Sequence, residues 1–122
     1  MRVLLAEDEP DIQLITRLAL EDAGCSVVVV GDGQAAIASA QSQPFDVVLL
    51  DVMMPRVDGF TACALLQQDP RTRSMPVIFL TAKSQEDEVR HGLAIGARGY
   101  IVKPFDVFDL AQRINEILAG KA

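Results

Sequence analysis

Five short apolar runs, separated by segments of helical periodicity, constrain the fold of this 122-residue chain more than any other feature. Unbroken runs of Val, Ile and Leu are typical of strands buried on both faces of a parallel sheet, whereas half-exposed strands alternate. The segments between the runs carry apolar residues three or four positions apart, as amphipathic helices do. The runs lie at residues 3–6, 27–30, 47–50, 77–80 and 100–102.

The segments between the runs also carry helix-boundary signals. Asp32, Asp58 and Asp106 are each predicted to cap a helix, because an aspartate side chain accepts hydrogen bonds from the free amides of a first turn. Ser84, with Asp87 three residues later, resembles a capping box. The predicted buried stripes are Ile12, Ile15, Ala19 and Ala23; Ala36, Ile37 and Ala40; Phe60, Cys63 and Leu66; Val89 and Leu93; and Leu110, Ile114, Ile117 and Leu118.

This alternation predicts an α/β fold: a doubly wound, five-stranded parallel sheet with helices on both faces. A length of 122 residues fits one domain, which we place at residues 1–122. No run approaches the ~18 apolar residues of a membrane span, and nothing near Met1 resembles a signal peptide. A net charge of −6 argues against direct nucleic-acid binding. We therefore expect a cytoplasmic protein without membrane contact.

Reactive side chains follow four of the five predicted strands. Glu7 and Asp8 follow the first, Asp51 the third, Thr81 the fourth and Lys103 the fifth. In open parallel sheets, ligands bind outside the carboxyl ends of the strands, so these side chains are expected to meet at one edge.

Three carboxylates at one edge repel each other unless a cation neutralises them, and Lys103 supplies a single positive charge. Oxygen ligands without His or Cys favour a hard divalent cation, Mg²⁺ or a similar ion such as Mn²⁺. Such an ion also binds phosphate oxygens. The residues therefore predict a Mg²⁺-dependent acidic pocket prepared for a phosphoryl group.

Four segments in register resemble the receiver domain of two-component response regulators, in particular the chemotaxis regulators. They are the acidic pair Glu7-Asp8, the phosphoacceptor segment 50–59, the segment Leu80-Thr81-Ala82, and residues 100–105 with Lys103-Pro104. The resemblance runs from Val3 to about Leu118. It implies the flavodoxin-like strand order 2-1-3-4-5 and a cis Lys103–Pro104 peptide bond.

The resemblance also implies the roles of individual residues. Asp51 is the implied phosphoacceptor, with Lys103 and Thr81 contacting the phosphoryl group. The implied metal ligands are Glu7, Asp8, Asp51 and the backbone carbonyl of Met53. Thr81 and Tyr100 are the implied switch residues, and Met53 and Lys83 the positions that tune dephosphorylation.

The implied function is a phosphoacceptor switch of a phosphorelay, a signalling protein that is not a turnover enzyme. A sensor histidine kinase or a histidine phosphotransfer protein would donate the phosphoryl group. The surface of the fourth helix, fifth strand and fifth helix would then control a downstream protein that the sequence does not identify. The protein is expected to be a monomer or a phosphorylation-dependent dimer.

Two other functions are consistent with this kind of fold. A haloacid-dehalogenase-like phosphatase also forms an aspartyl phosphate, but it needs a second acid two residues later, where this chain has Met53. An FMN-binding electron carrier needs a phosphate loop after the first strand, where this chain has Glu7-Asp8-Glu9. Met1 directly before the first strand favours a native start, and both a stand-alone regulator and the receiver of a longer protein remain open.

Overall fold

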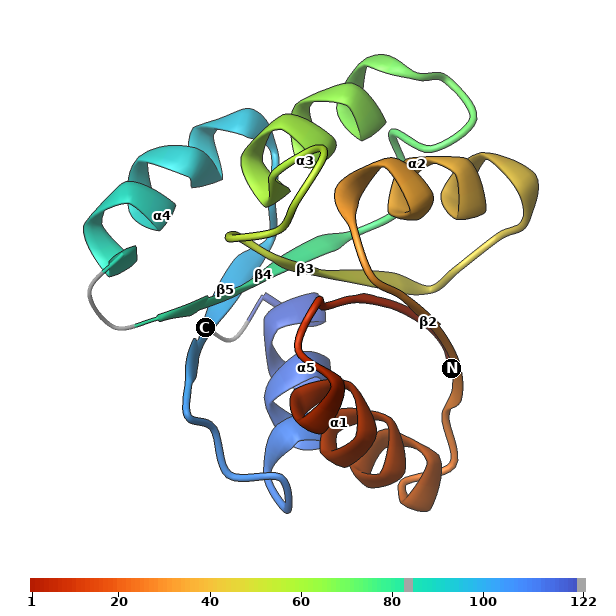
Figure 1. The fold of residues 1–122 in the computed structure, drawn as a ribbon, viewed down its shortest axis with the longest axis vertical. Helices are drawn as coiled ribbons and strands as arrows, with labels where there is room; N and C mark the ends of the chain where they lie inside the picture. The colour runs from red at the N-terminus through yellow and green to blue at the C-terminus, as the bar shows by residue number, and fades with distance from the viewer. Residues whose placement is uncertain (83–84, 121–122) are drawn as a thin grey trace.

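The computed structural model describes residues 1–82 and 85–120, and its five strands form one parallel sheet (Figure 1). The order across the sheet is β2-β1-β3-β4-β5. The predicted fold class and the strand order implied by the resemblance are therefore confirmed. The strands are β1 (Arg2–Ala6), β2 (Ser26–Val30), β3 (Val47–Asp51), β4 (Val77–Ala82) and β5 (Gly99–Lys103).

Helices cover both faces of this sheet. Figure 1 shows α2, α3 and α4 on one face and α1 and α5 on the other. Their bounds are α1 (Pro10–Asp22), α2 (Gly33–Ser42), α3 (Gly59–Gln68), α4 (Glu86–Gly92) and α5 (Leu110–Leu118), with a short 3₁₀ helix, η2 (Leu93–Ile95), after α4. None of the helices in the described part of the chain is long and apolar enough to span a bilayer. The Lys103–Pro104 peptide bond is cis.

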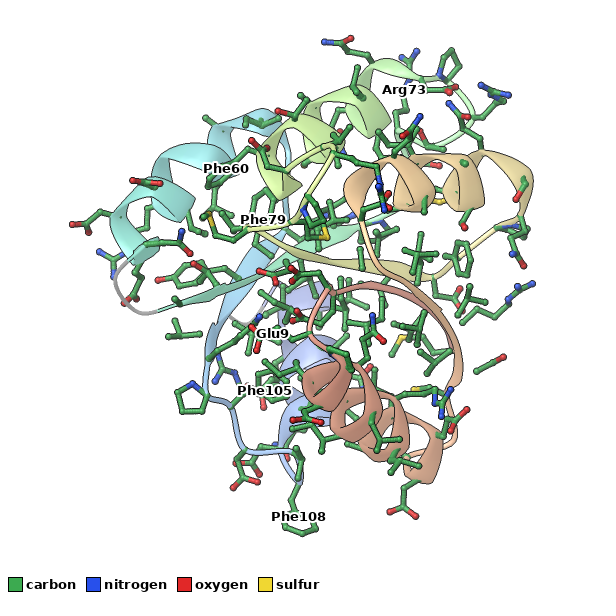
Figure 2. All side chains as sticks on the ribbon, in the orientation of Figure 1. Glu9, Phe60, Arg73, Phe79, Phe105 and Phe108 are labelled. Atoms are coloured by element: carbon green, nitrogen blue, oxygen red, sulfur yellow. The ribbon has the colours of Figure 1, made fainter. Side chains whose placement is uncertain are left out.

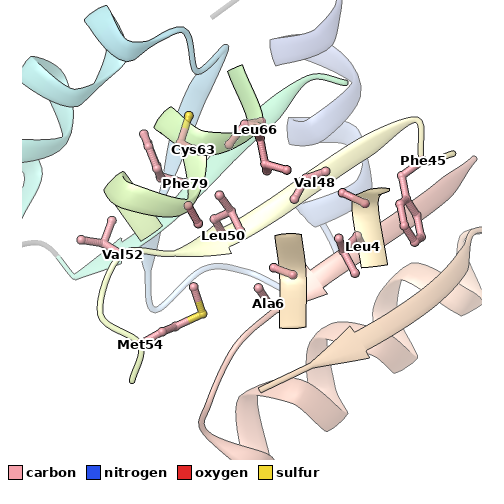
Figure 3. Close-up of a cluster of buried hydrophobic side chains, with 14 of the residues drawn as sticks. Leu4, Ala6, Phe45, Val48, Leu50, Val52, Met54, Cys63, Leu66 and Phe79 are labelled. Atoms are coloured by element: carbon pink, nitrogen blue, oxygen red, sulfur yellow. The ribbon is translucent and has the colours of Figure 1, made fainter. Parts of the chain in front are cut away.

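Each strand contributes to two separate cores, which explains why the apolar runs are unbroken. Leu4 and Ala6 of β1 belong to the cluster under α2, α3 and α4, and Figure 3 shows them there with Phe79. Val3 and Leu5 belong to the cluster under α1 and α5. Because successive side chains of a strand point to opposite faces, a strand covered on both sides needs apolar residues at every position.

Two of the three predicted aspartate caps are confirmed. Asp32 accepts a hydrogen bond from the amide of Ala35 at the start of α2, and Asp58 accepts one from Thr61 at the start of α3. The third is wrong: Asp106 accepts a hydrogen bond from the amide of Phe108 in a turn, and α5 begins only at Leu110. Local side-chain bonding in the turn uses the acceptor that a helix cap would need. The capping box at Ser84 lies outside the described residues.

The predicted buried stripe of α1 is also wrong in part. Ile15 is about half exposed, at 49%, whereas Thr16 and Leu20 are fully buried. Six of the thirteen residues of this helix are apolar, leaving Pro10 aside, and they lie on more than one face. Periodicity alone therefore does not select the buried face, and packing against the sheet and α5 decides it. The result is an exposed apolar surface on α1 formed by Leu14, Ile15 and Leu18.

Candidate functional site

Three carboxylates meet at the carboxyl edge of the sheet, as their places in the sequence predicted. Glu7 and Asp8 follow β1, and Asp51 is the last residue of β3, the strand beside it. Each offers one carboxylate oxygen, and these oxygens all lie within 4.8 Å of one another. Glu7 and Asp51 are buried and Asp8 is exposed, so the cluster opens to solvent on one side.

Lys103, at the end of β5, reaches across the edge and binds two of these carboxylates. Its Nζ donates to Glu7 Oε1 at 2.6 Å and to Asp51 Oδ2 at 3.1 Å. Burial by itself would lower the pKa of Lys103, but the hydrogen bond to Glu7 and the attraction of Asp51 raise it above its ordinary value. The ammonium is therefore charged and acts as the internal counter-ion of the pocket.

Glu7 is the most perturbed acid of the cluster. Its side chain is fully buried, and burial raises its pKa to about 7 although the hydrogen bond from Lys103 opposes the shift. The neighbouring Asp51 carboxylate contributes to this rise. A divalent cation would favour the ionised form of Glu7, because a nearby opposite charge stabilises a carboxylate. The affinity of the cluster for a metal would therefore depend on pH.

The donor set fits a hard divalent cation. All three side chains offer oxygen, and one lysine does not balance three carboxylates. Magnesium keeps several waters and uses few carboxylates, which matches a cluster that is open at Asp8.

The loop after β3 holds the Asp51 carboxylate from its other side. The amide of Met53 donates to Asp51 Oδ1 at 3.2 Å, while the Met53 side chain is 62% exposed at the edge of the pocket. Gly59 passes so close that a Cβ there would lie 2.4 Å from the Asp51 carbonyl oxygen. Only glycine permits this approach, which seats the start of α3 against the end of β3.

Thr81 and Tyr100 lie on one face of neighbouring strands. Phe79 pairs with Tyr100 across β4 and β5, so Thr81, two residues after Phe79, is a diagonal neighbour of Tyr100. The Thr81 hydroxyl is buried and donates to the carbonyl of Ala82 at 3.1 Å. The Tyr100 hydroxyl donates to the Glu86 carboxylate at the start of α4, at 2.8 Å. Lys83 lies outside the described residues.

Sequence reasoning missed three side chains that organise this edge. Glu86 and Arg90 of α4 both contact the Tyr100 hydroxyl, and Arg90 also pairs with Glu86. Arg56, in the loop after β3, forms an ion pair with Asp32, which the sequence marks only as a helix cap. The Glu86–Arg90 spacing of four is a usable sequence signal for a helical ion pair, whereas nothing local connects Arg56 with Asp32.

Comparison with known proteins gives one consistent family. The family model described as "Response regulator receiver domain" matches residues 3–115. "Transcriptional activator protein IrlR" of Burkholderia pseudomallei is 40% identical over 97% of this chain, but the chain spans only 50% of that relative. "Protein PilH" of Pseudomonas aeruginosa is 38% identical, and the alignment covers 98% of both chains.

One solved structure of a receiver domain has the same fold as this chain, and its description names a metal ion. The receiver domain of the sensor histidine kinase PA1611 from Pseudomonas aeruginosa superposes with a TM-score of 0.86 at 34% identity, over 98% of this chain and 97% of that one. That structure is described as holding a magnesium ion coordinated in its active site cleft.

Proposed function

The chain belongs to the response regulator receiver family, and from this premise we propose that it is a phosphoacceptor switch in which Asp51 receives a phosphoryl group from a histidine-bearing partner. One observation carries the proposal. The oxygens of Glu7, Asp8 and Asp51 lie within 4.8 Å of one another, and Lys103 binds two of the three carboxylates. This is the arrangement that phosphoryl transfer to a carboxylate needs, namely a nucleophile, a metal-binding acidic pair and a fixed cation.

We assign Asp51 as the nucleophile because it lies in the segment that resembles the phosphoacceptor segment of the family and its two oxygens accept from Met53 N–H and Lys103 Nζ. One of its oxygens attacks phosphorus, an O–P bond forms, and the N–P bond to the donor imidazole breaks with its electron pair passing to that nitrogen. Met53 N–H and Lys103 Nζ hold the Asp51 oxygens before the reaction, which reduces the freedom lost on reaching the reactive geometry. Lys103 then shifts from the carboxylate to a phosphoryl oxygen.

We propose that Glu7, Asp8, Asp51 and the Met53 carbonyl hold Mg²⁺. The ion supplies neutralisation of the charge that develops on the transferring oxygens. PA1611, to which the chain is 34% identical, is described with magnesium in its active site cleft, which supports the choice of ion. Mn²⁺ has the same preference for oxygen ligands and is expected to substitute.

The apolar surface on α1 supports a protein as the phosphoryl donor. Ile15 and Leu18 line one groove with Phe108, which is 93% exposed and projects from the molecule in Figure 2. Ile15 also lines an adjoining groove with Lys103 and Pro104, so this surface is continuous with the pocket. We propose that a helix carrying the phosphohistidine docks here. Ile15→Asp should slow transfer from a phosphohistidine protein and leave the reaction with acetyl phosphate unchanged.

The proposed response to phosphorylation begins at Thr81. Three new acceptor oxygens beside the pocket attract its hydroxyl away from the Ala82 carbonyl. Tyr100 can then turn inward and leave Glu86, which changes a groove of about 320 Å³ lined by Tyr100 and residues of β5 and α5. A downstream protein would recognise this surface, since a ligand favours the state with which it interacts better.

Decay of the aspartyl phosphate should depend on Met53 and Lys83. Met53 is exposed at the edge of the pocket, where an apolar side chain hinders the approach of water. We expect Met53→Asn and Lys83→Glu to change the rate of phosphate loss, followed by the mass of the protein over time. Unchanged rates in both variants would contradict this role.

The decisive experiment is incubation with acetyl phosphate, with and without Mg²⁺, followed by intact mass. Wild type should gain one phosphoryl group only with Mg²⁺, and Asp51→Asn should gain none. Asp22→Asn, an exposed acid at the end of α1, is the matched control and should behave as wild type. A gain in Asp51→Asn, or none in wild type with Mg²⁺, would contradict the proposal. A small-molecule phosphatase assay without turnover would exclude the enzyme alternative.

A further inference from the structure

The segment that follows the phosphoacceptor contains a strained turn. Arg56 has a φ of 68°, in the left-handed region that non-glycine residues rarely adopt. The amide of Val57 donates to the carbonyl of Pro55 at 2.8 Å, which closes a three-residue γ-turn centred on Arg56. A γ-turn with positive φ is rare and strained, so surrounding contacts must hold it.

Two contacts from the start of α2 hold this turn. Arg56 Nε lies 2.8 Å from Asp32 Oδ2, in an ion pair whose aspartate side chain is only 13% exposed. Beside it, Gly33 packs so tightly on Val57 that a Cβ would lie 2.0 Å from the Val57 carbonyl oxygen. Asp32 uses its other oxygen to cap α2, so its position is fixed by the helix.

The strand order gives this ion pair its place beside the pocket. Asp32 follows β2 and Arg56 follows β3, and these strands lie on either side of β1, which ends at the acidic pair. The ion pair thus connects the two loops that flank Glu7 and Asp8. Three residues before Arg56, the amide of Met53 donates to the Asp51 carboxylate.

We propose that the Asp32–Arg56 ion pair is a positioning device for phosphotransfer: it holds the turn after β3 so that the Met53 backbone keeps the Asp51 carboxylate, and the metal beside it, in place. Neither side chain is a ligand of the metal, and both act through Met53. The metal part of this inference rests on the proposed function. The orientation of Met53 and Asp51 does not, because it is a property of the metal-free protein.

The test compares two arginines whose ion pairs have similar length and exposure. Arg71 pairs with Asp69 at 2.9 Å with side-chain exposures of 64% and 16%, nearly the same as Arg56 and Asp32 at 2.8 Å with 67% and 13%. Arg56→Ala keeps the non-glycine strain and removes only the ion pair. Asp32→Ser removes the ion pair from the other side and keeps a good helix cap.

The first readout is hydrogen exchange of the Met53 amide in EDTA, followed by NMR. Exchange should be faster in Arg56→Ala and in Asp32→Ser than in wild type, and unchanged in Arg71→Ala. Equal exchange in wild type and Arg56→Ala would overturn the inference. This readout needs no metal, so it tests the ion pair even if the proposed function fails.

The second readout is Mg²⁺ affinity by isothermal titration calorimetry. Loss of a contact that orients a metal ligand typically weakens metal binding by about tenfold or more. We expect Arg56→Ala to weaken Mg²⁺ binding by about tenfold. The double variant Asp32→Ser/Arg56→Ala should bind as weakly as Arg56→Ala alone, because both changes remove the same contact. Equal weakening in Arg71→Ala, or additive losses in the double variant, would overturn the inference. Absence of Mg²⁺ binding in wild type would instead refute the proposed function.

Discussion

Lowering the pH from 8 to 6 should weaken Mg²⁺ binding to the pocket about tenfold, because binding needs the ionised form of Glu7. With a pKa of about 7, Glu7 is about nine-tenths ionised at pH 8 and about one-tenth ionised at pH 6. The cause is burial of a carboxyl side chain with no exposed surface, opposed by Lys103. A carboxyl at its ordinary pKa of 4.5 would stay ionised over this range and leave the affinity constant.

Calorimetric titration of the protein with Mg²⁺ at pH 6, 7 and 8 measures this effect directly. Repeating the pH 7 titration in buffers of different ionisation enthalpy counts the protons displaced, and about half a proton per Mg²⁺ is expected there. Glu7→Gln should bind Mg²⁺ more weakly and lose the pH dependence. An affinity in wild type that stays constant from pH 6 to 8 would refute the reasoning, because it would mean that Lys103 outweighs burial.

The same ionisation acts on stability in the metal-free protein with the opposite sign. The folded state holds the Glu7 proton more tightly than the unfolded state, whose pKa is the ordinary 4.5. Between pH 4.5 and 7 the unfolded chain therefore binds fewer protons, and the free energy of unfolding in EDTA should fall as the pH rises. Urea denaturation should show this decline in wild type and not in Glu7→Gln.

Three further predictions concern single residues. Phe79→Ala should lower the free energy of unfolding in urea by about 3–5 kcal/mol, because Phe79 is fully buried, whereas Phe108→Ala at a 93% exposed site should change it by less than about 0.5 kcal/mol. Tyr100 is the sole tyrosine and the chain has no tryptophan, so phosphorylation with acetyl phosphate and Mg²⁺ should change the intrinsic fluorescence; identical spectra before and after would contradict the coupling. Lys103→Met removes the cation that lowers the pKa of Glu7. The midpoint of the pH dependence of Mg²⁺ binding should therefore lie at a higher pH than in wild type, and an unchanged midpoint would contradict the role of Lys103.

The parts of the fold that the sequence predicted correctly are those in which one local pattern has one structural solution. A strand covered on both faces must be apolar throughout, so the run at residues 47–50 leaves little choice. The same logic places Asp51 at the carboxyl edge of the sheet, because the first charged residue after a buried run marks the end of the strand. Asp32 and Asp58 were predictable as caps because their hydrogen-bond partners lie three residues away.

Prediction failed where several local solutions compete. In α1 the apolar residues surround much of the helix, so Ile15 and Leu20 look alike in the sequence although one is half exposed and the other buried. Around Asp106 a turn and a helix start offer the same amide partners, and the turn forms. In α1 the difference depends on packing against segments distant in the chain, which periodicity does not take into account, whereas at Asp106 a local turn competes with the helix start.

The contacts that organise the pocket are of this distant kind. Lys103 reaches Glu7 across 96 residues of sequence, and Arg56 reaches Asp32 across 24. The strand order β2-β1-β3 brings Asp32 and Arg56 to the two sides of the acidic pair, although neither residue has a local signal for the other. Once the order is known, the pairing becomes one to look for, because Asp32 and Arg56 follow the two strands that flank β1. The topology of the sheet therefore determines which residues can hold the loop after Asp51, and the residue types then determine how tightly they hold it.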